Sequence, residues 1–295
     1  MREIVVGPAE AAKKLANFLK KQFPIGYVRK LFRKNGVRLN GRRGKPDDAI
    51  GANDSIQLFI PFEAQNSKPT TPRGEIEIIF EDETLLVIDK PAGLAVHEGK
   101  TVSHANTVAG WIERNYRDKA LRPLLVHRLD RDTSGLLLLA RNENAQAELE
   151  KQFETGKLAK EYLALVIGRL AANAGKIESP LPGRDGNLVP ALTRYKVIKR
   201  FRETTLVRVN IETGRLHQIR LHFAQLGHPV VMDDQHGDFT FNKKFRKEFG
   251  LKRQFLHADK MAIGDAEKAH RWSIAPAPDL AQALRRLEIN ESRAR

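Results

Sequence analysis

The sequence predicts an α+β protein built from two units, a small α/β unit over residues 1–62 and a larger, mostly antiparallel domain over residues 74–295. In the larger part, segments typical of strands outnumber helical ones and do not alternate with them, which argues against a parallel sheet. Residues 63–73 carry two prolines and no apolar periodicity, as linkers do. The chain's 295 residues are enough for more than one hydrophobic core.

The first unit is predicted to contain two helices, a short hairpin and a closing strand. Apolar side chains recur at helical spacing from Leu15 to Phe23, and a second helix ends at Gly36. Residues 37–41 alternate into an Asn-Gly pair, which is a strong hairpin signal. Residues 55–60 form the strand that closes the unit.

The first unit is also strongly basic. It holds 13 Lys and Arg residues against 5 Asp and Glu residues, which gives +8 of the chain's formal net charge of +15. Basic side chains crowd the second helix and the hairpin, namely Arg29, Lys30, Arg33, Lys34, Arg38, Arg42 and Arg43. A solvated helix face is the ordinary explanation of a basic amphipathic helix. The density of charge in this unit favours phosphate binding instead.

The larger domain is predicted to contain several strands and a few short helices. The expected strands cover residues 76–80, 85–89, 136–139, 162–167 and 205–211, and the expected helices cover 108–116, 143–154 and 217–226. Asn142 is placed to cap the second of these helices. Lys90 and His97, in the loop after the second strand, are interpreted as structural residues.

A second basic segment lies near the end of the chain. Residues 236–254 hold six basic side chains among four phenylalanines and are typical of an inserted loop with a helix. This segment is a candidate for binding RNA, and its phenylalanines either pack against the domain or stack on bases. Residues 290–295 are expected to fray.

The stretch that organises the larger domain runs from residue 127 to residue 135 and reads His-Arg-Leu-Asp-Arg-Asp-Thr-Ser-Gly. Four leucines follow it and predict a buried strand. An aspartate beside a buried strand is costly to desolvate unless a cation pairs with it. Asp130 is therefore a candidate functional residue, although a polar turn that caps a core strand explains the pattern as well.

This stretch resembles the signature of the RluA family of RNA pseudouridine synthases. Residues 160–166 (Lys-Glu-Tyr-Leu-Ala-Leu-Val) and 214–220 (Gly-Arg-Leu-His-Gln-Ile-Arg) resemble two further stretches of that family, in the family's order. The resemblance extends from about residue 74 to the end of the chain. The attached basic unit and the run 227–234 are most similar to the large-subunit members, of the RluC type. The basic unit itself resembles the S-four-like RNA-binding domain.

The resemblance implies the pseudouridine synthase fold, a long bent mixed sheet with its site in a central cleft. It implies an isomerase that converts specific uridines to pseudouridine in large-subunit (23S) ribosomal RNA without a cofactor. Asp130 is then the nucleophile, and Arg220, one helical turn after His217, is the cation that pairs with it. Without the resemblance, Arg220 would be expected to form an ordinary surface ion pair, worth under about 1 kcal/mol.

The resemblance assigns further roles around the site. Tyr162 matches the family's active-site tyrosine, whose ring can stack on uracil and whose hydroxyl can take part in proton transfer. A core tyrosine is the ordinary alternative. Arg128 is the candidate for filling the gap that an extruded base leaves. Arg215 and His217 are expected to bind the RNA backbone or to shape their loop.

Other functional classes fit the sequence less well. A non-catalytic protein that binds ribosomal RNA or assists ribosome assembly is the main alternative, and a hydrolase of N-glycosidic bonds is a third hypothesis. The chain has no cysteine, which excludes disulfides and thiolate zinc sites, and it has neither a histidine metalloprotease motif nor a phosphate-binding glycine loop. We therefore expect no metal and no cofactor.

The composition also bears on partner and location. A net charge of +15 and a pI of about 10.0 favour a polyanionic partner, here ribosomal RNA or a pre-ribosomal particle. The first residues lack the apolar core of a signal peptide, and no apolar run reaches membrane-spanning length. We therefore expect a soluble, cytoplasmic protein with no membrane partner, and a monomer is the default where the sequence gives no signal of oligomeric state.

Overall fold

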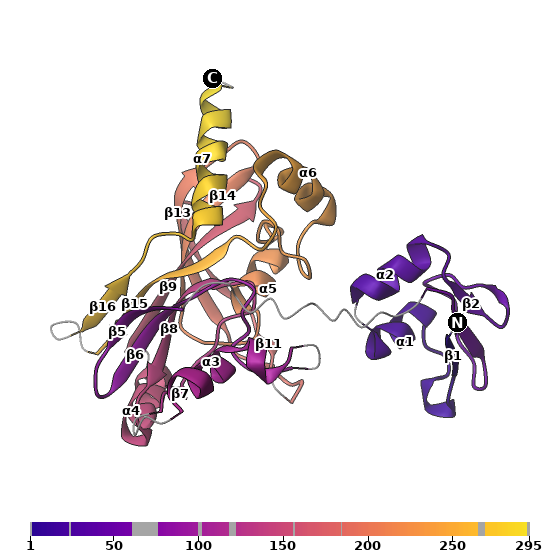
Figure 1. The fold of residues 1–295 in the computed structure, drawn as a ribbon. Helices are drawn as coiled ribbons and strands as arrows, with labels where there is room; N and C mark the ends of the chain where they lie inside the picture. Colours follow the sequence, from indigo (N-terminus) through magenta and orange to yellow (C-terminus); the bar gives the residue numbers. More distant parts are fainter. Residues whose placement is uncertain are drawn as a thin grey trace. The chain divides into compact units, whose positions relative to one another are not determined.

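The structure is a computed structural model that describes residues 2–23, 25–60, 76–99, 102–117, 122–155, 157–183, 185–264 and 269–293. The chain divides into two compact units, Met1–Pro69 and Thr70–Arg295 (Figure 1). The predicted linker, 63–73, lies outside the described residues, so the domain boundaries at 62 and 74 stay predictions. Within the described ranges, no helix combines the length and the apolar character that a membrane span requires.

The first unit is a four-stranded antiparallel sheet packed against two helices. Its elements are β1 (Arg2–Val5), α1 (Leu15–Gln22), α2 (Ile25–Arg33), β2 (Val37–Leu39), β3 (Arg42–Arg43) and β4 (Ser55–Leu58), and the strand order is β1-β4-β2-β3. Phe18 and Leu19 of α1 share one buried core with Leu31 of α2 and Ile56 of β4. The two predicted helices, the hairpin and the closing strand are therefore present, and β1 is a strand that the sequence did not predict.

The hairpin between β2 and β3 turns at the predicted Asn-Gly pair. Asn40 and Gly41 both have positive φ angles, 49° and 78°. A turn with two such residues matches the right-handed twist of paired strands. Arg38 lies opposite Arg43 in the ladder, so the hairpin carries arginine on both of its strands.

The second unit is organised around one ten-stranded mixed sheet (Figure 1). Its strands are β5 (Glu77–Glu81), β6 (Leu85–Lys90), β7 (Leu124–Leu125), β8 (Ser134–Ala140), β9 (Leu158–Ile167), β10 (Ala174–Glu178), β13 (Leu192–Arg200), β14 (Thr204–Ile211), β15 (Leu256–Ile263) and β16 (His270–Ser273). Its helices are α3 (Val108–Asn115), α4 (Glu143–Glu154), α5 (Gln218–Gln225), α6 (Phe239–Phe249) and α7 (Pro278–Arg293).

The order of the sheet is β10-β13-β14-β9-β15-β8-β6-β5, with β16 beside β15 and β7 beside β8. β15 runs parallel to β8. The other pairs that the structure describes in this sheet are antiparallel. A short separate ladder joins β11 (Leu181–Pro182) to β12 (Leu188–Val189). The predicted mostly antiparallel α+β architecture is confirmed.

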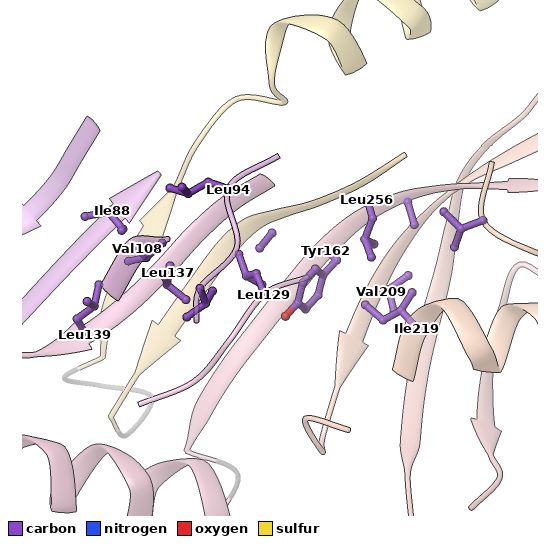
Figure 2. Close-up of a cluster of buried hydrophobic side chains, with 14 of the residues drawn as sticks. Ile88, Leu94, Val108, Leu129, Leu137, Leu139, Tyr162, Val209, Ile219 and Leu256 are labelled. Carbon is purple, nitrogen blue, oxygen red and sulfur yellow. The ribbon is translucent and has the colours of Figure 1, made fainter. Parts of the chain in front are cut away.

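Helices cover both faces of the sheet, and the side chains of β9 alternate between the cores on the two faces. Successive residues of a strand point to opposite faces. Tyr162 and Ala164 belong to a core with side chains of α3 and α5, whereas Leu163 and Leu165 belong to a core with side chains of α6 and α7. Figure 2 shows part of the first core, with the ring of Tyr162 among aliphatic side chains. Tyr162 and α5 therefore lie on the same face.

The four leucines after the signature stretch form the middle of β8, as predicted. All seven residues of this strand are buried. Leu137 and Leu139 pack in the core of α3 and α5, and Leu136 and Leu138 pack in a further core that includes Leu149 of α4. A strand buried on both faces reads as a continuous apolar run, which explains the absence of alternation.

The predicted cap of α4 is confirmed, and the predicted frayed end of the chain is wrong. The Asn142 side-chain oxygen accepts from the backbone N–H of Ala145 at 2.8 Å. α7 continues to Arg293, and the amide of Asn290 donates to the carboxylate of Glu248 at 2.9 Å. Residues 290–293 are therefore helical and Asn290 is anchored to α6, while residues 294–295 lie outside the described residues.

The basic segment 236–254 contains a helix, α6, as expected. Phe245 and Phe249 are buried, and their ring centroids lie 4.4 Å apart in the core shared with α7. Packing rather than base stacking is therefore the role of these two phenylalanines. Phe239 is exposed at the first turn.

Candidate active site

Asp130 lies in the loop that leads into β8. The backbone N–H of Thr133 donates to the carbonyl of Asp130 at 3.1 Å and closes a turn. At Gly135 the φ angle is +115°, and a Cβ atom there would lie 2.2 Å from the carbonyl oxygen of Ala258 on β15. Glycine alone fits such a position. Gly135, five residues after Asp130, thus lets β8 approach β15 closely.

Lys90, at the end of β6, fixes this loop from one side. Its ammonium group donates to the carbonyl oxygens of Pro91 (2.9 Å), Leu94 (2.8 Å) and Arg131 (3.1 Å). The side chain is fully buried, and burial lowers its pKa to about 7. Three acceptors replace the water that Lys90 loses, which agrees with the structural role expected from the sequence.

The start of β15 fixes the loop from the other side. The amide of Gln254 donates to the hydroxyl of Thr133 at 2.7 Å. The hydroxyl of Ser134 and Nδ1 of His257 are 2.9 Å apart, and Nε2 of His257 is 3.0 Å from the carbonyl of Ala275. Because a carbonyl only accepts, Nε2 carries the proton and Nδ1 accepts from Ser134. This buried Ser-His contact is structural.

Arg220, on the first turn of α5, reaches Asp130 as predicted. Its Nη1 donates to Oδ2 of Asp130 at 3.0 Å. The side chain of Arg220 is 4% exposed and that of Asp130 is 17% exposed, so this pair sits at the edge of the interior. The expectation of an ordinary surface pair is wrong, because the guanidinium is almost completely withdrawn from water.

A second carboxylate, which the sequence did not predict, also binds Arg220. Asp233 is fully buried and takes a bidentate contact, with Nε at 2.6 Å and Nη2 at 2.8 Å. Burial opposes the charge on Arg220, but the two aspartates outweigh it and raise the pKa of the guanidinium above its ordinary value. Arg220 is thus shared between Asp130 and Asp233 rather than paired with Asp130 alone.

The turn that carries Asp233 is itself strongly constrained. Oδ1 of Asp233 also accepts the backbone N–H groups of Gln235 and His236, each at 2.9 Å. The amide of Asn242 on α6 donates to the carbonyl of Asp233 at 2.8 Å and accepts from the N–H of Met232 at 2.7 Å. α6 therefore orients Asp233, and Asp233 orients Arg220.

Tyr162 faces the same space as Asp130. Its side chain is buried in the core that includes Leu129 and Leu256 (Figure 2). Burial, and to a smaller extent the charge of Asp130, raise the pKa of the phenol above its ordinary value. Tyr162 is therefore a neutral phenol near pH 7.

These side chains line a cavity of about 380 Å³, within the size range of small-molecule sites. Asp130, Tyr162, Arg220, Arg128, Arg215 and His217 all border it, so the structure brings together every residue predicted for the site of the larger domain. Arg128 and Arg215 are exposed. His97 is exposed and borders the cavity too, and its interpretation as a structural residue stays a prediction.

His217 forms a short chain of polar groups beside Asp130. Its Nε2 lies 3.9 Å from Oδ1 of Asp130, and its Nδ1 lies 3.1 Å from Nε2 of His236. It caps α5 with a left-handed backbone, φ +55°, which is uncommon for residues other than glycine. Burial lowers the pKa of His217 below its ordinary value, although Asp130 opposes this. No sequence pattern predicted the place of His236 beside it.

The predicted phosphate-binding residues of the first unit whose side chains the structure describes are on its surface. Arg29, Arg33, Lys34, Arg38, Arg42 and Arg43 are exposed. The guanidinium of Arg38 lies over the ring of Phe59, 4.9 Å from its centroid. Within the described part of the chain, no group of His, Asp and Glu residues is arranged to hold a metal ion.

Comparisons with known proteins agree with this geometry. The sequence pattern of the family described as RNA pseudouridylate synthase matches residues 84–225, a range that contains Asp130, Tyr162 and Arg220. The chain is 35% identical over 268 residues to ribosomal large subunit pseudouridine synthase C of Vibrio cholerae serotype O1, with 84% of each chain covered. It is 34% identical over 281 residues to the protein of the same name from Escherichia coli (strain K12), with 86% of each chain covered.

Solved structures show the same fold. Human RNA Pseudouridylate Synthase Domain Containing 4 aligns with a TM-score of 0.61 at 23% identity, covering 77% of this chain and 97% of that one. Human RNA Pseudouridylate Synthase Domain Containing 1 aligns with a TM-score of 0.56 at 23% identity, covering 76% and 90%. With its signature stretches gathered around one cavity and its sequence similar over most of its length to named members, this chain belongs to the family of RNA pseudouridine synthases.

Proposed function

We propose that this protein isomerises specific uridines to pseudouridine in large-subunit ribosomal RNA, with Asp130 as the nucleophile. The relatives from Vibrio cholerae and Escherichia coli are named for that reaction on the large ribosomal subunit. The observation that carries the proposal is the carboxylate of Asp130 at the border of a cavity, 3.0 Å from a buried guanidinium and close to Tyr162.

The reaction rearranges bonds within one nucleotide. The bond from N1 to C1′ breaks, the uracil turns, C5 joins C1′, and the proton on C5 leaves while N1 gains one. The composition of the RNA does not change, so the chemistry requires neither oxidant nor group donor. The protein must supply an ionised nucleophile, a place to hold the free base and groups that move a proton.

Arg220 stabilises the ionised form of Asp130. Two unit charges at about 3 Å interact by roughly 5 kcal/mol at an effective dielectric near 20. Asp233 reduces the net effect because it shares the same guanidinium. Asp130 therefore has a cation beside it that it shares with Asp233.

Tyr162 and the exposed arginines complete the site. As a neutral phenol, Tyr162 offers its ring for stacking on the uracil and its hydroxyl for a hydrogen bond. Arg128 fills the space that the extruded base leaves, which offsets part of the unstacking cost of a few kcal/mol. Arg215 and His217 contact the RNA beside the target.

The arginines of the first unit add phosphate contacts, through Arg29, Arg33, Lys34, Arg38, Arg42 and Arg43. Ribosomal RNA, free or in a pre-ribosomal particle, is the partner of this surface. Asp130, Tyr162 and Arg220 come from one chain, so a monomer suffices for the reaction.

The test uses Asp130→Asn, which keeps the shape of the side chain and removes its charge. Protein and large-subunit RNA transcripts are incubated, and pseudouridine is mapped through its alkali-resistant carbodiimide adduct. We expect wild type to form pseudouridine and the variant to bind RNA with little change but to form none. Variant turnover within about tenfold of wild type would refute the role of Asp130.

The same experiment distinguishes the alternatives. A non-catalytic RNA-binding or ribosome-assembly protein gives no adduct with wild type. A hydrolase of the N-glycosidic bond releases uracil and lowers the mass of the RNA, whereas isomerisation leaves the mass unchanged.

A further inference from the structure

Lys160 is a buried amine at the cavity, and the reaction described above assigns it no role. It lies on β9, two residues before Tyr162, so the two side chains share one face of the strand, about 7 Å apart along it. Its side chain borders the same cavity as Asp130. Lys160 is only 3% exposed, which is rare for a lysine without a charged partner.

The partner of Lys160 on the protein is an aromatic ring. Its Nζ lies 3.9 Å from the ring centroid of Phe153 on α4. Among the described residues, neither a carboxylate nor a hydrogen-bond acceptor contacts this amine. Burial accordingly lowers its pKa to about 7. Lys90 is buried as deeply, but three carbonyl oxygens surround its ammonium group.

His127, which also borders the cavity, does not provide a hydrogen-bond acceptor for Lys160. Its Nε2 accepts the backbone N–H of Leu138 at 3.0 Å, so the proton of the neutral ring sits on Nδ1. Burial and the charge of Lys160 hold the pKa of His127 well below its ordinary value. His127 therefore stays neutral and does not form an ion pair with the amine of Lys160.

A buried, unpaired amine costs stability unless something binds it. The residues that the structure describes give Lys160 no hydrogen-bond acceptor, so we expect the ligand of the cavity to supply one. A planar base can reach a side chain this deep at a smaller desolvation cost than a charged phosphodiester. The carbonyl oxygens O2 and O4 are the acceptors that uracil offers.

We propose that the amine of Lys160 is a catalytic group that binds a carbonyl oxygen of the target uracil and stabilises the negative charge of the detached base. This inference rests on the proposed function. When the N1–C1′ bond breaks towards the base, its electron pair stays on N1 and spreads onto O2 and O4. The contact therefore strengthens after cleavage, and Lys160 raises turnover more than it raises affinity.

The test compares Lys160→Met with wild type and with Lys260→Met. Methionine has nearly the length of lysine and suits a buried site. Lys260 lies on the neighbouring strand β15, is about half exposed and faces Glu161 at 4.0 Å, so its replacement is a matched change of charge outside the cavity. Single-turnover pseudouridine formation and RNA affinity are measured on the transcript that wild type modifies.

We expect Lys160→Met to lower the rate at saturating protein by about 10²–10³-fold, as the loss of one preorganised donor does. RNA affinity stays within about threefold of wild type, and Lys260→Met changes neither quantity. Lys160→Met also unfolds at the same or a higher temperature than wild type, because a buried charge is removed.

The pH profile gives a second readout. At limiting protein concentration, the wild-type rate falls as the pH rises above about 7, because the free amine loses its proton. Lys160→Met lacks this decline. The other titratable groups that border the cavity are His97, His127, Arg128, Asp130, Glu150, Tyr162, Arg215, His217 and Arg220, and the variant leaves all of them in place.

Chemical rescue checks that the amine itself is required. The chain has no cysteine, so Lys160→Cys can be unfolded, alkylated with 2-bromoethylamine at that position alone and refolded. The product restores an amine of nearly the same length, and we expect it to recover at least tenfold in rate over the unmodified variant. Wild type taken through the same steps serves as the control.

Each outcome bears on one claim. If wild type forms no pseudouridine, the proposed function fails. If wild type is active and Lys160→Met turns over within twofold of it, the role of Lys160 is wrong. If the variant binds RNA more weakly and its log–log salt slope falls by about 0.7–0.9, Lys160 binds a phosphate instead of the base. A lower unfolding temperature would make Lys160 a structural residue.

Discussion

Replacing Asp233 with asparagine tests whether Arg220 is held by one carboxylate or by two. Asp233 is fully buried and accepts two charged hydrogen bonds from Arg220, at 2.6 and 2.8 Å. Breaking a buried ion pair by removing one partner costs about 3–5 kcal/mol. Part of this loss is offset, because Arg220 keeps its 3.0 Å contact with Asp130. We expect Asp233→Asn to lower the free energy of unfolding by about 3 kcal/mol.

Asp234→Asn is the matched control. The carboxylate of Asp234 lies 3.8 Å from Nη2 of Arg220, but its side chain is 70% exposed. An exposed pair contributes less than about 1 kcal/mol. Urea unfolding of the two variants and wild type measures the difference, and single-turnover assays on ribosomal RNA measure activity. We expect Asp233→Asn to lose at least tenfold in rate, because Asp233 no longer fixes the position of the guanidinium that contacts Asp130.

The pH dependence of this difference has a defined sign. Burial raises the pKa of Asp233, but the hydrogen bonds from Arg220 and the backbone outweigh it and leave the pKa below its ordinary value. An unfolded aspartate titrates near about 3.9. The stabilisation by Asp233 is therefore present above about pH 4 and is lost as the pH falls below it. If Asp233→Asn and Asp234→Asn unfold alike at pH 7 and both turn over like wild type, the shared guanidinium has no role.

Three further predictions address other parts of the protein. Between about pH 7 and 10, the free energy of unfolding of wild type rises relative to that of Lys160→Met by up to about 1.4 kcal/mol per pH unit. The reason is that the amine of Lys160 loses its proton at a lower pH in the folded protein than in the unfolded chain. Parallel pH dependences of the two free energies, measured by urea unfolding, would contradict this. Replacing Arg38, Arg42 and Arg43 with glutamine lowers the salt slope of RNA binding by about 0.7–0.9 for each phosphate group that the hairpin no longer neutralises, and an unchanged slope would mean that this hairpin does not touch RNA. Tyr162→Phe retains RNA affinity and loses turnover, because the hydroxyl takes part in the reaction, and a Tyr162→Phe rate equal to that of wild type in single-turnover assays would exclude this role. Tyr162→Leu also removes stacking, so equal rates for the two variants would exclude a contribution of stacking.

Features that depend on neighbouring residues could be predicted from the sequence. The turn at Asn40 and Gly41 needs two positive φ angles, and the residue types state this directly. The cap by Asn142 acts within three residues. The pairing of Asp130 with Arg220 came from the family resemblance, because residues 90 positions apart give no local signal of contact.

Asp233 and β15 show why the remainder could not be predicted. Asp233 and Asp234 are adjacent and chemically identical, yet one is fully buried and the other is exposed. Tertiary packing alone makes that distinction. β15 is a central strand, yet it carries the buried polar residues His257 and Asp259. Asp259 pairs with Arg208, which is distant in the sequence. A local pattern cannot reveal such compensation.

β15 also explains how the site is assembled. In the ladder, Tyr162 of β9 pairs with Ala258 of β15, and Ala258 pairs with Gly135 of β8. These residues form one row across the sheet, and the missing Cβ of Gly135 lets β8 come close to β15. The loop of Asp130 ends at this row, so a strand that contains neither Asp130 nor Arg220 sets the distance between Asp130 and Tyr162. The geometry of the site therefore depends on backbone spacing within the sheet as much as on the charged side chains that line the cavity.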